Sequence, residues 1–157
     1  MKNNNKGFTL IEVVISMAII VIVVALSSAM VVTMSKISQK REYENKCISE
    51  YQSAAKLVLD FKNAYSISKY SLFSIDENQI IIKSGTDDYI LNFDTATKTL
   101  TAQIFNYSTN QVDSKNITFE NIIRISFVKQ DALVKCTYEF LNFHQYTNIL
   151  DFGVNWW

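Results

Sequence analysis

The stretch VVISMAIIVIVVALSSAMVVTMS, Val13–Ser35, decides the fold, because none of its 23 residues carries a charge. A helix needs about 20 apolar residues to cross a bilayer. The stretch therefore predicts a transmembrane helix or the apolar region of a signal peptide. A signal peptide is cut after small residues, and Ser27-Ser28-Ala29 would serve, but its apolar region usually has only about 7–15 residues.

The residues before this stretch set its orientation and add one unusual carboxylate. Lys2, Lys6 and the initiator amine precede it without an acid. By the positive-inside rule the N-terminus stays in the cytoplasm and the C-terminal part lies outside. Glu12 stands at the start of the apolar run. A carboxylate costs a few kcal/mol in hydrocarbon, and residues of this kind are usually functional.

The run Lys6-Gly7-Phe8-Thr9-Leu10-Ile11-Glu12, followed by a long apolar helix, resembles the N-terminus of type IV prepilins and pseudopilins. The resemblance implies that prepilin peptidase cuts between Gly7 and Phe8 on the cytoplasmic side and methylates the new Phe8 amine. Glu12 matches the family glutamate that serves assembly, where it is expected to pair with the Phe8 amine of a neighbouring subunit. Unlike many pilins, the chain has no Gly or Pro within the apolar helix.

The helix is expected to continue beyond the membrane. Residues 36–65 contain no Gly or Pro, and opposite charges fall four residues apart at Lys40–Glu44, Glu42–Lys46 and Lys46–Glu50. Apolar residues recur on one helical face. They are Cys47, Tyr51, Ala54, Ala55, Val58, Phe61 and Tyr65. We thus divide the chain into a leader (1–7), a membrane and filament-core helix (8–35), an outer helix half (36–65) and a head part (66–157).

Residues 66–157 have the short alternating runs of an antiparallel sheet. A linker is predicted at 66–71 and a surface loop at 108–116, because both are polar. The predicted strands are 79–83, 88–93, 99–107, 117–128 and 133–143. In the last of these, Val134, Cys136, Tyr138 and Phe140 share one face. One long helix followed by such a sheet predicts an α+β fold, which also resembles the pilin architecture.

Composition excludes several function classes. The 15 basic and 15 acidic residues balance, so nucleic acid is not an expected partner. No catalytic motif, Gly-rich phosphate loop or CxxC occurs, and His144 is the only histidine. We expect no catalytic residue, no metal, no cofactor and no enzymatic activity. The adjacent acids Asp87 and Asp88 are interpreted as a solvated turn rather than a Ca²⁺ site.

The two cysteines, Cys47 and Cys136, fall on the apolar faces of the outer helix half and of the last predicted strand. If the sheet covers the helix, both point into one interface, where two interpretations stay open. A disulfide would persist outside the cytoplasm and add about 4 kcal/mol of stability. Two buried thiols would act as small hydrophobic side chains.

The favoured function is a structural subunit of a type IV pilus or pseudopilus, and a minor subunit is favoured over a major one. The subunit would wait in the cytoplasmic membrane, be processed by prepilin peptidase, and join other pilin subunits in an extracellular helical filament. A competence or type II secretion pseudopilin is one alternative, and a membrane-tethered extracellular binding domain that never polymerises is another. Low Gly and Pro with abundant Asn, Ile and Lys favours a bacterial, Gram-positive source.

Overall fold

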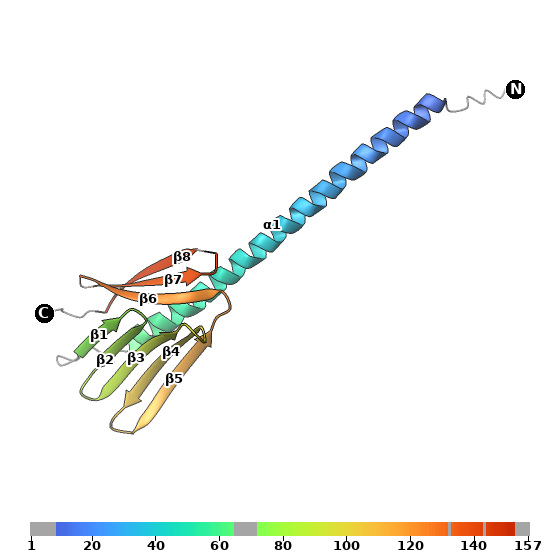
Figure 1. Ribbon diagram of the computed structural model, residues 1–157. Coiled ribbons are helices and arrows are strands. Elements are labelled where there is room, and N and C mark those ends of the chain that lie inside the picture. The colour runs from blue at the N-terminus through green and yellow to red at the C-terminus, as the bar shows by residue number, and fades with distance from the viewer. Residues whose placement is uncertain (1–8, 65–71, 132, 143, 153–157) are drawn as a thin grey trace. The chain divides into compact units, whose positions relative to one another are not determined.

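A computed structural model describes residues 9–64, 72–131, 133–142 and 144–152 (Figure 1). In these residues one helix, α1 (Leu10–Ala64), precedes eight strands that all pair antiparallel. The predicted α+β class, with a long N-terminal helix and antiparallel sheet, is confirmed. The chain divides into two compact units, Met1–Glu44 and Asn45–Trp157, and α1 contributes to both. The predicted linker at 66–71 lies outside the described residues.

In the first unit, α1 is apolar and uncovered. Its Leu, Ile, Val and Met side chains are between 42% exposed, at Val13, and 85% exposed, at Leu10, and Tyr43 near its end is half-buried. The most apolar 18-residue window has a mean hydropathy of 2.9, and none of it is buried. Length and composition therefore suit a membrane span. On its polar side, the Lys40 ammonium lies 3.8 Å from the Glu44 carboxylate, as the four-residue spacing predicts.

In the second unit, α1 buries one face. The buried residues are Cys47, Ala54, Leu57, Val58 and Phe61. Their spacing is that of an amphipathic helix, and they confirm the predicted face with Leu57 added. Tyr51 and Ala55 are half-buried, and Tyr65 lies outside the described residues.

A five-stranded sheet follows in simple up-and-down order. Its strands are β1 (Leu72–Asp76), β2 (Gln79–Lys83), β3 (Asp87–Asp94), β4 (Thr99–Asn106) and β5 (Gln111–Thr118). Alternate residues of β2, β3 and β4 are buried, because successive side chains of a strand point to opposite faces. The predicted β2–β3 hairpin is confirmed, and the Ser84 N–H donates to the Asp87 carbonyl at 2.8 Å.

A second, three-stranded sheet completes the unit. It consists of β6 (Ile122–Gln130), β7 (Leu133–Phe140) and β8 (Gln145–Asp151). Val134, Cys136, Tyr138 and Phe140 are all buried, which confirms the face predicted for β7. The β6–β7 hairpin predicted at 129–131 is also present, and Asp131 adopts a positive φ of 53° in its turn. A short polar side chain tolerates that conformation.

Glu77, in the turn between β1 and β2, links the two sheets. Its carbonyl accepts a hydrogen bond from the Phe127 N–H of β6 at 2.8 Å, and its carboxylate forms an ion pair with Arg124. The ring of Phe73 on β1 also contacts that of Phe152, with centroids 5.5 Å apart. The two sheets stay separate, and β6 of the second sheet contacts β1, β2 and β3 of the first (Figure 1).

Several predicted boundaries were wrong, mostly where strands are exposed. The predicted loop at 108–116 contains most of β5, whose residues are exposed except for half-buried Ile117. The predicted strand at 117–128 is interrupted after Thr118, and β6 begins at Ile122. The last predicted strand ends at Phe140 rather than at 143, and neither β1 nor β8 was predicted. Asp87 and Asp88 begin β3 rather than forming a turn.

Candidate functional site

Thr9 and Glu12 form a cap at the start of α1. The N–H and the hydroxyl of Thr9 both donate to Glu12 Oε2, each at 2.9 Å. In return, the Thr9 carbonyl accepts from the N–H groups of Glu12 and Val13 at 3.0 and 3.3 Å. This is the carboxylate arm of a capping box, in which the third helical residue reaches back to the capping residue. The negative charge also lies at the favourable, N-terminal end of the helix dipole.

The cap occupies only one oxygen of the Glu12 carboxylate. Oε2 takes both Thr9 bonds, whereas Oε1 accepts none from the described residues, and the side chain is exposed. A carboxylate has about four acceptor positions on its two oxygens. Glu12 is thus held in one orientation while keeping acceptor capacity for a further donor.

The four hydroxyl groups within the apolar run are also satisfied locally. Each donates to the backbone carbonyl four residues earlier, at 2.7–2.9 Å. They belong to Ser16, Ser27, Ser28 and Thr33. A polar group in lipid must find its partner inside the protein, since hydrocarbon offers none. These side chains therefore do not oppose burial of the helix in an apolar environment.

Gly7 and Phe8, the predicted cleavage and methylation residues, lie outside the described residues. Cleavage after Gly7, methylation of Phe8 and the assembly role of Glu12 stay predictions. What the structure adds is the local geometry of Glu12, which lies four residues after the predicted new N-terminus at Phe8.

In the second unit, Glu50 of α1 binds the connection between the two sheets. Its carboxylate accepts from the N–H groups of Glu120, Asn121 and Ile122 at 3.0–3.2 Å, and from Asn121 Nδ2 at 2.9 Å. Three successive N–H groups aimed at one anion form a backbone nest. Sequence reasoning placed Glu50 beside Lys46 on the helix and missed this partner 70 residues away, for which no local pattern exists.

Tyr51, the next residue, attaches α1 to the three-stranded sheet. Its hydroxyl donates to Asn148 Oδ1 at 2.5 Å. Its ring stacks on Tyr146, with centroids 4.8 Å apart, and meets Tyr138 edge-on at 5.2 Å. Aromatic pairs of this geometry contribute about 0.5–1.5 kcal/mol beyond their buried area. Glu50 and Tyr51 together hold the second sheet against the helix.

Cys47 and Cys136 are both buried, with 1% and 0% of their surface exposed, and the structure contains them as free cysteines. Burial raises the pKa of the Cys136 thiol to about 12. The thiolate is the reactive form, so Cys136 is chemically quiet at neutral pH. The disulfide between them stays a prediction, as does the alternative of two buried thiols.

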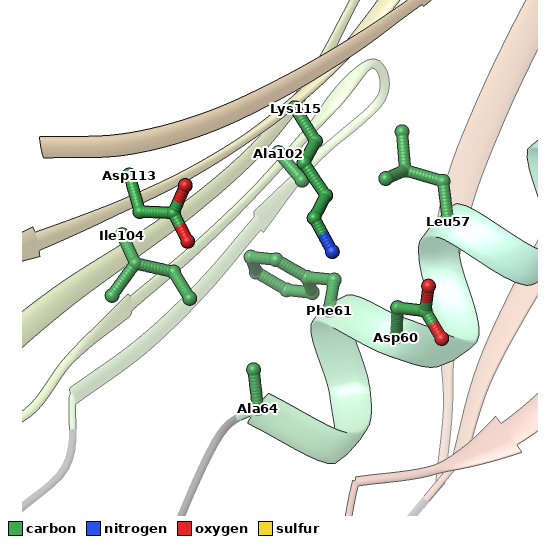
Figure 2. Close-up of a pocket in the computed structure, with 8 residues that line it drawn as sticks. All are labelled: Leu57, Asp60, Phe61, Ala64, Ala102, Ile104, Asp113 and Lys115. Carbon is green, nitrogen blue, oxygen red and sulfur yellow. The ribbon is translucent and has the colours of Figure 1, made fainter.

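A small pocket of about 120 Å³ opens between α1 and the β4–β5 edge of the first sheet (Figure 2). Its lining residues are Leu57, Asp60, Phe61, Ala64, Ala102, Ile104, Asp113 and Lys115. In Figure 2 the Lys115 side chain extends from β5 toward the helical turn that carries Phe61. An adjoining opening of about 400 Å³ also reaches Lys56 and Ile117. Both openings lie between α1 and β5, whose residues are exposed except for the half-buried Ile117.

Nothing in the described part of the chain resembles a metal centre. No group of three or more His, Cys, Asp or Glu side chains there could hold a metal ion. His144 is exposed, and its backbone carbonyl accepts from the Phe140 N–H.

Comparison with known protein families gives one match. Residues 2–28 match the prokaryotic N-terminal methylation motif, which spans the predicted leader, Glu12 and most of the apolar run. Comparisons with curated proteins and with solved structures give no significant match. The motif, with the α+β architecture of a long N-terminal helix and antiparallel sheets, supports a type IV pilin-like protein with the N-terminal signal of a pilin or pseudopilin precursor.

Proposed function

We propose that the protein is a structural subunit of a type IV pilus or pseudopilus that moves from the cytoplasmic membrane into an extracellular filament. One observation carries the proposal: the methylation motif leads directly into an apolar helix whose side chains are exposed, while every described buried residue lies at Cys47 or later. An uncovered apolar helix needs lipid or other helices around it. A subunit that exchanges lipid for neighbouring helices uses both surroundings in turn.

Processing would begin on the cytoplasmic face. Lys2 and Lys6 hold the leader there, and their removal with the leader makes extraction of the helix from the membrane less costly. Prepilin peptidase would cut between Gly7 and Phe8 and methylate the Phe8 amine. Gly7 has no side chain to hinder a close approach by the enzyme.

Assembly would use the Glu12 carboxylate. The Thr9 cap holds Oε2, so Oε1 is the oxygen that would accept the charged Phe8 amine of a neighbouring subunit. Pairing neutralises two charges that are otherwise costly in apolar surroundings. Since the pair forms only at one axial offset between subunits, it would also set the register of the incoming helix.

Among filament subunits, we infer a minor one. The inference extends the family resemblance of residues 2–28 to the role of the subunit. The low Gly and Pro content fits a Gram-positive genome, which favours a pilus or competence system over type II secretion. Counting copies of the chain per filament by quantitative mass spectrometry tests the minor assignment.

Two substitutions at Glu12 distinguish the role of its negative charge from the role of its hydrogen bonds to Thr9. Glu12→Gln keeps an oxygen that can accept the Thr9 bonds but carries no charge, whereas Glu12→Ala removes both. We expect both variants to be processed, to remain in the membrane, and to be at least tenfold depleted from sheared filaments. Ser16→Ala, which deletes a locally bonded hydroxyl of the same helix, is the matched control and should assemble normally.

The outcomes discriminate clearly. If Glu12→Gln enters filaments like the unmodified chain while Glu12→Ala does not, the carboxylate serves the helix cap and the ion-pair role is wrong. If the unmodified chain itself stays in the membrane fraction of cells that make filaments, the alternative of a tethered extracellular domain is correct.

A further inference from the structure

The outer edge of β5 is open. β5 pairs with β4 along one side, and no described strand pairs with the other. Such an edge readily accepts another strand, and proteins usually protect it with prolines, bulges or charges. The chain has no proline, and the β4–β5 register has no shift. Asp113 and Lys115 are inward-facing charges of the kind that protect an edge, and both line the pocket on the α1 side of the sheet. The other face of β5 carries no charge.

The backbone groups that point out from this edge follow from the ladder. Beyond β5, the Phe119 N–H donates to the Lys98 carbonyl at 3.0 Å. In an antiparallel pair, hydrogen-bonded positions alternate, so the odd-numbered residues of β5 bond to β4. The even-numbered residues therefore direct N–H and C=O outward. They are Val112, Ser114, Asn116 and Thr118.

β8 is the end strand of the second sheet, and no described strand pairs with its outer side (Figure 1). The Phe140 N–H donates to the His144 carbonyl, so by the same alternation the even-numbered residues of β8 bond to β7. The outward-directed residues are Gln145, Thr147, Ile149 and Asp151. They lie on the face away from α1, since Tyr146 and Asn148 contact Tyr51.

The two edges match in hydrogen bonding, face and side-chain type. On both strands the outward-directed residues lie on the face away from α1, so an antiparallel pair would continue the sheet with the same face toward the helices. One register places Val112 opposite Ile149, Ser114 opposite Thr147, and Asn116 opposite Gln145. The apolar pair is 58% and 57% exposed in the single chain. On the other face, Lys115 and Asp113 would meet the polar groups of Tyr146 and Asn148.

We propose that β5 of one copy pairs antiparallel with β8 of a second copy in this register, through about six backbone hydrogen bonds. The contact uses a different edge on each copy, so it is heterologous and can continue from copy to copy without closing. Its place in a filament rests on the proposed function, whereas the pairing itself does not. If the protein is a minor subunit, this pairing would place its copies next to one another in the filament rather than one at a time among other subunits.

Disulfide trapping between two differently tagged full-length copies tests the register in cells that make filaments. Opposed residues of a hydrogen-bonded pair have Cα atoms about 5.5 Å apart, within bridging range. Val112→Cys with Ile149→Cys, and Asn116→Cys with Gln145→Cys, should each give a cross-linked dimer on mild oxidation. The exchanged combinations, Val112→Cys with Gln145→Cys and Asn116→Cys with Ile149→Cys, are offset by four residues, or about 13 Å, and should give at least tenfold less.

A proline in β5 tests the pairing in a second way, because it can delete an outward hydrogen-bond donor while the pairing of β5 with β4 is kept. The Ser114 N–H points outward, so Ser114→Pro deletes a donor that β4 does not use. It should abolish the Val112–Ile149 cross-link, while Ser114→Ala should retain it. Equal cross-linking in matched and exchanged combinations, persistence in Ser114→Pro, or absence of both matched cross-links would overturn the pairing. If matched cross-links form in the membrane but the chain never enters filaments, the pairing stands and the filament role fails.

Discussion

Replacing Glu50 tests how the head is held to its helix. In the structure its carboxylate accepts from three successive backbone N–H groups and from the Asn121 amide. Glu50→Ala leaves all of them without this acceptor. Glu50→Gln keeps the shape, but one oxygen becomes an NH₂ group that faces N–H donors.

The expected loss follows from where each donor lies. Glu120 is exposed, so water can replace the carboxylate there, but Ile122 is fully buried. A buried donor left without a partner costs about 1–3 kcal/mol, and hydrogen bonds to a charged group contribute about 1.5–3 kcal/mol each. We therefore expect Glu50→Ala to lower the free energy of unfolding by about 3 kcal/mol and Glu50→Gln by roughly half of that.

The assay is urea unfolding of the full-length chain in detergent, followed by near-ultraviolet circular dichroism from the aromatic residues. Glu44→Ala is the matched control on the same helix, because it removes only an exposed ion pair with Lys40, worth about 0.3–0.5 kcal/mol. Amide exchange at Ile122 should accelerate in Glu50→Ala more than exchange within β3. Destabilisation of Glu50→Ala no larger than that of Glu44→Ala would refute the reasoning.

Four further predictions concern other parts of the molecule. Tyr51→Phe, which loses only the bond to Asn148, should cost about 1 kcal/mol of stability in urea unfolding, whereas Tyr51→Ala also loses ring packing and should cost about 3 kcal/mol. Burial raises the pKa of Cys136 from 9.0 to about 12, so above pH 9 the unfolded chain loses the thiol proton before the folded chain does. The free energy of unfolding should therefore fall as pH rises from 9 toward 12, and it should fall more steeply than in Cys136→Ala. Equal slopes for the two proteins would contradict this prediction. Alkylation in denaturant without reductant should label two thiols per chain, and labelling of none would establish the disulfide with Cys47. Gly7→Val should leave an uncut precursor in the membrane, detected as a larger band on immunoblots.

Periodicity predicted those elements that bury one face. The apolar spacing on the outer helix half and the alternation along β7 both reflect contact with the core. The buried face of β7 was predicted residue by residue, whereas the helix face was predicted without Leu57 and with the half-buried Tyr51 and Ala55. The N-terminal motif could also be recognised from the sequence, because it consists of a short run of adjacent residues.

Elements without a fully buried face could not be found in this way. β5 lies at a sheet edge where no apolar face is required, so its sequence is polar like that of a loop. β8 covers α1 with Tyr146 and Asn148, whose partial burial gives a weak alternation. The division into two sheets depends on the break between Thr118 and Ile122, which Glu50 stabilises from far along the chain. Such long-range contacts leave no local pattern.

Mass spectrometry of the mature N-terminus tests the central claim most directly. The protein should be purified from its native membrane and from sheared filaments, and its N-terminal peptide sequenced. A pilin-type subunit predicts a chain that begins at Phe8, carries one methyl group on the Phe8 amine and retains Glu12 and the whole apolar helix. A chain that begins at Met30, after Ala29, would show cleavage as an ordinary signal peptide and would contradict the account.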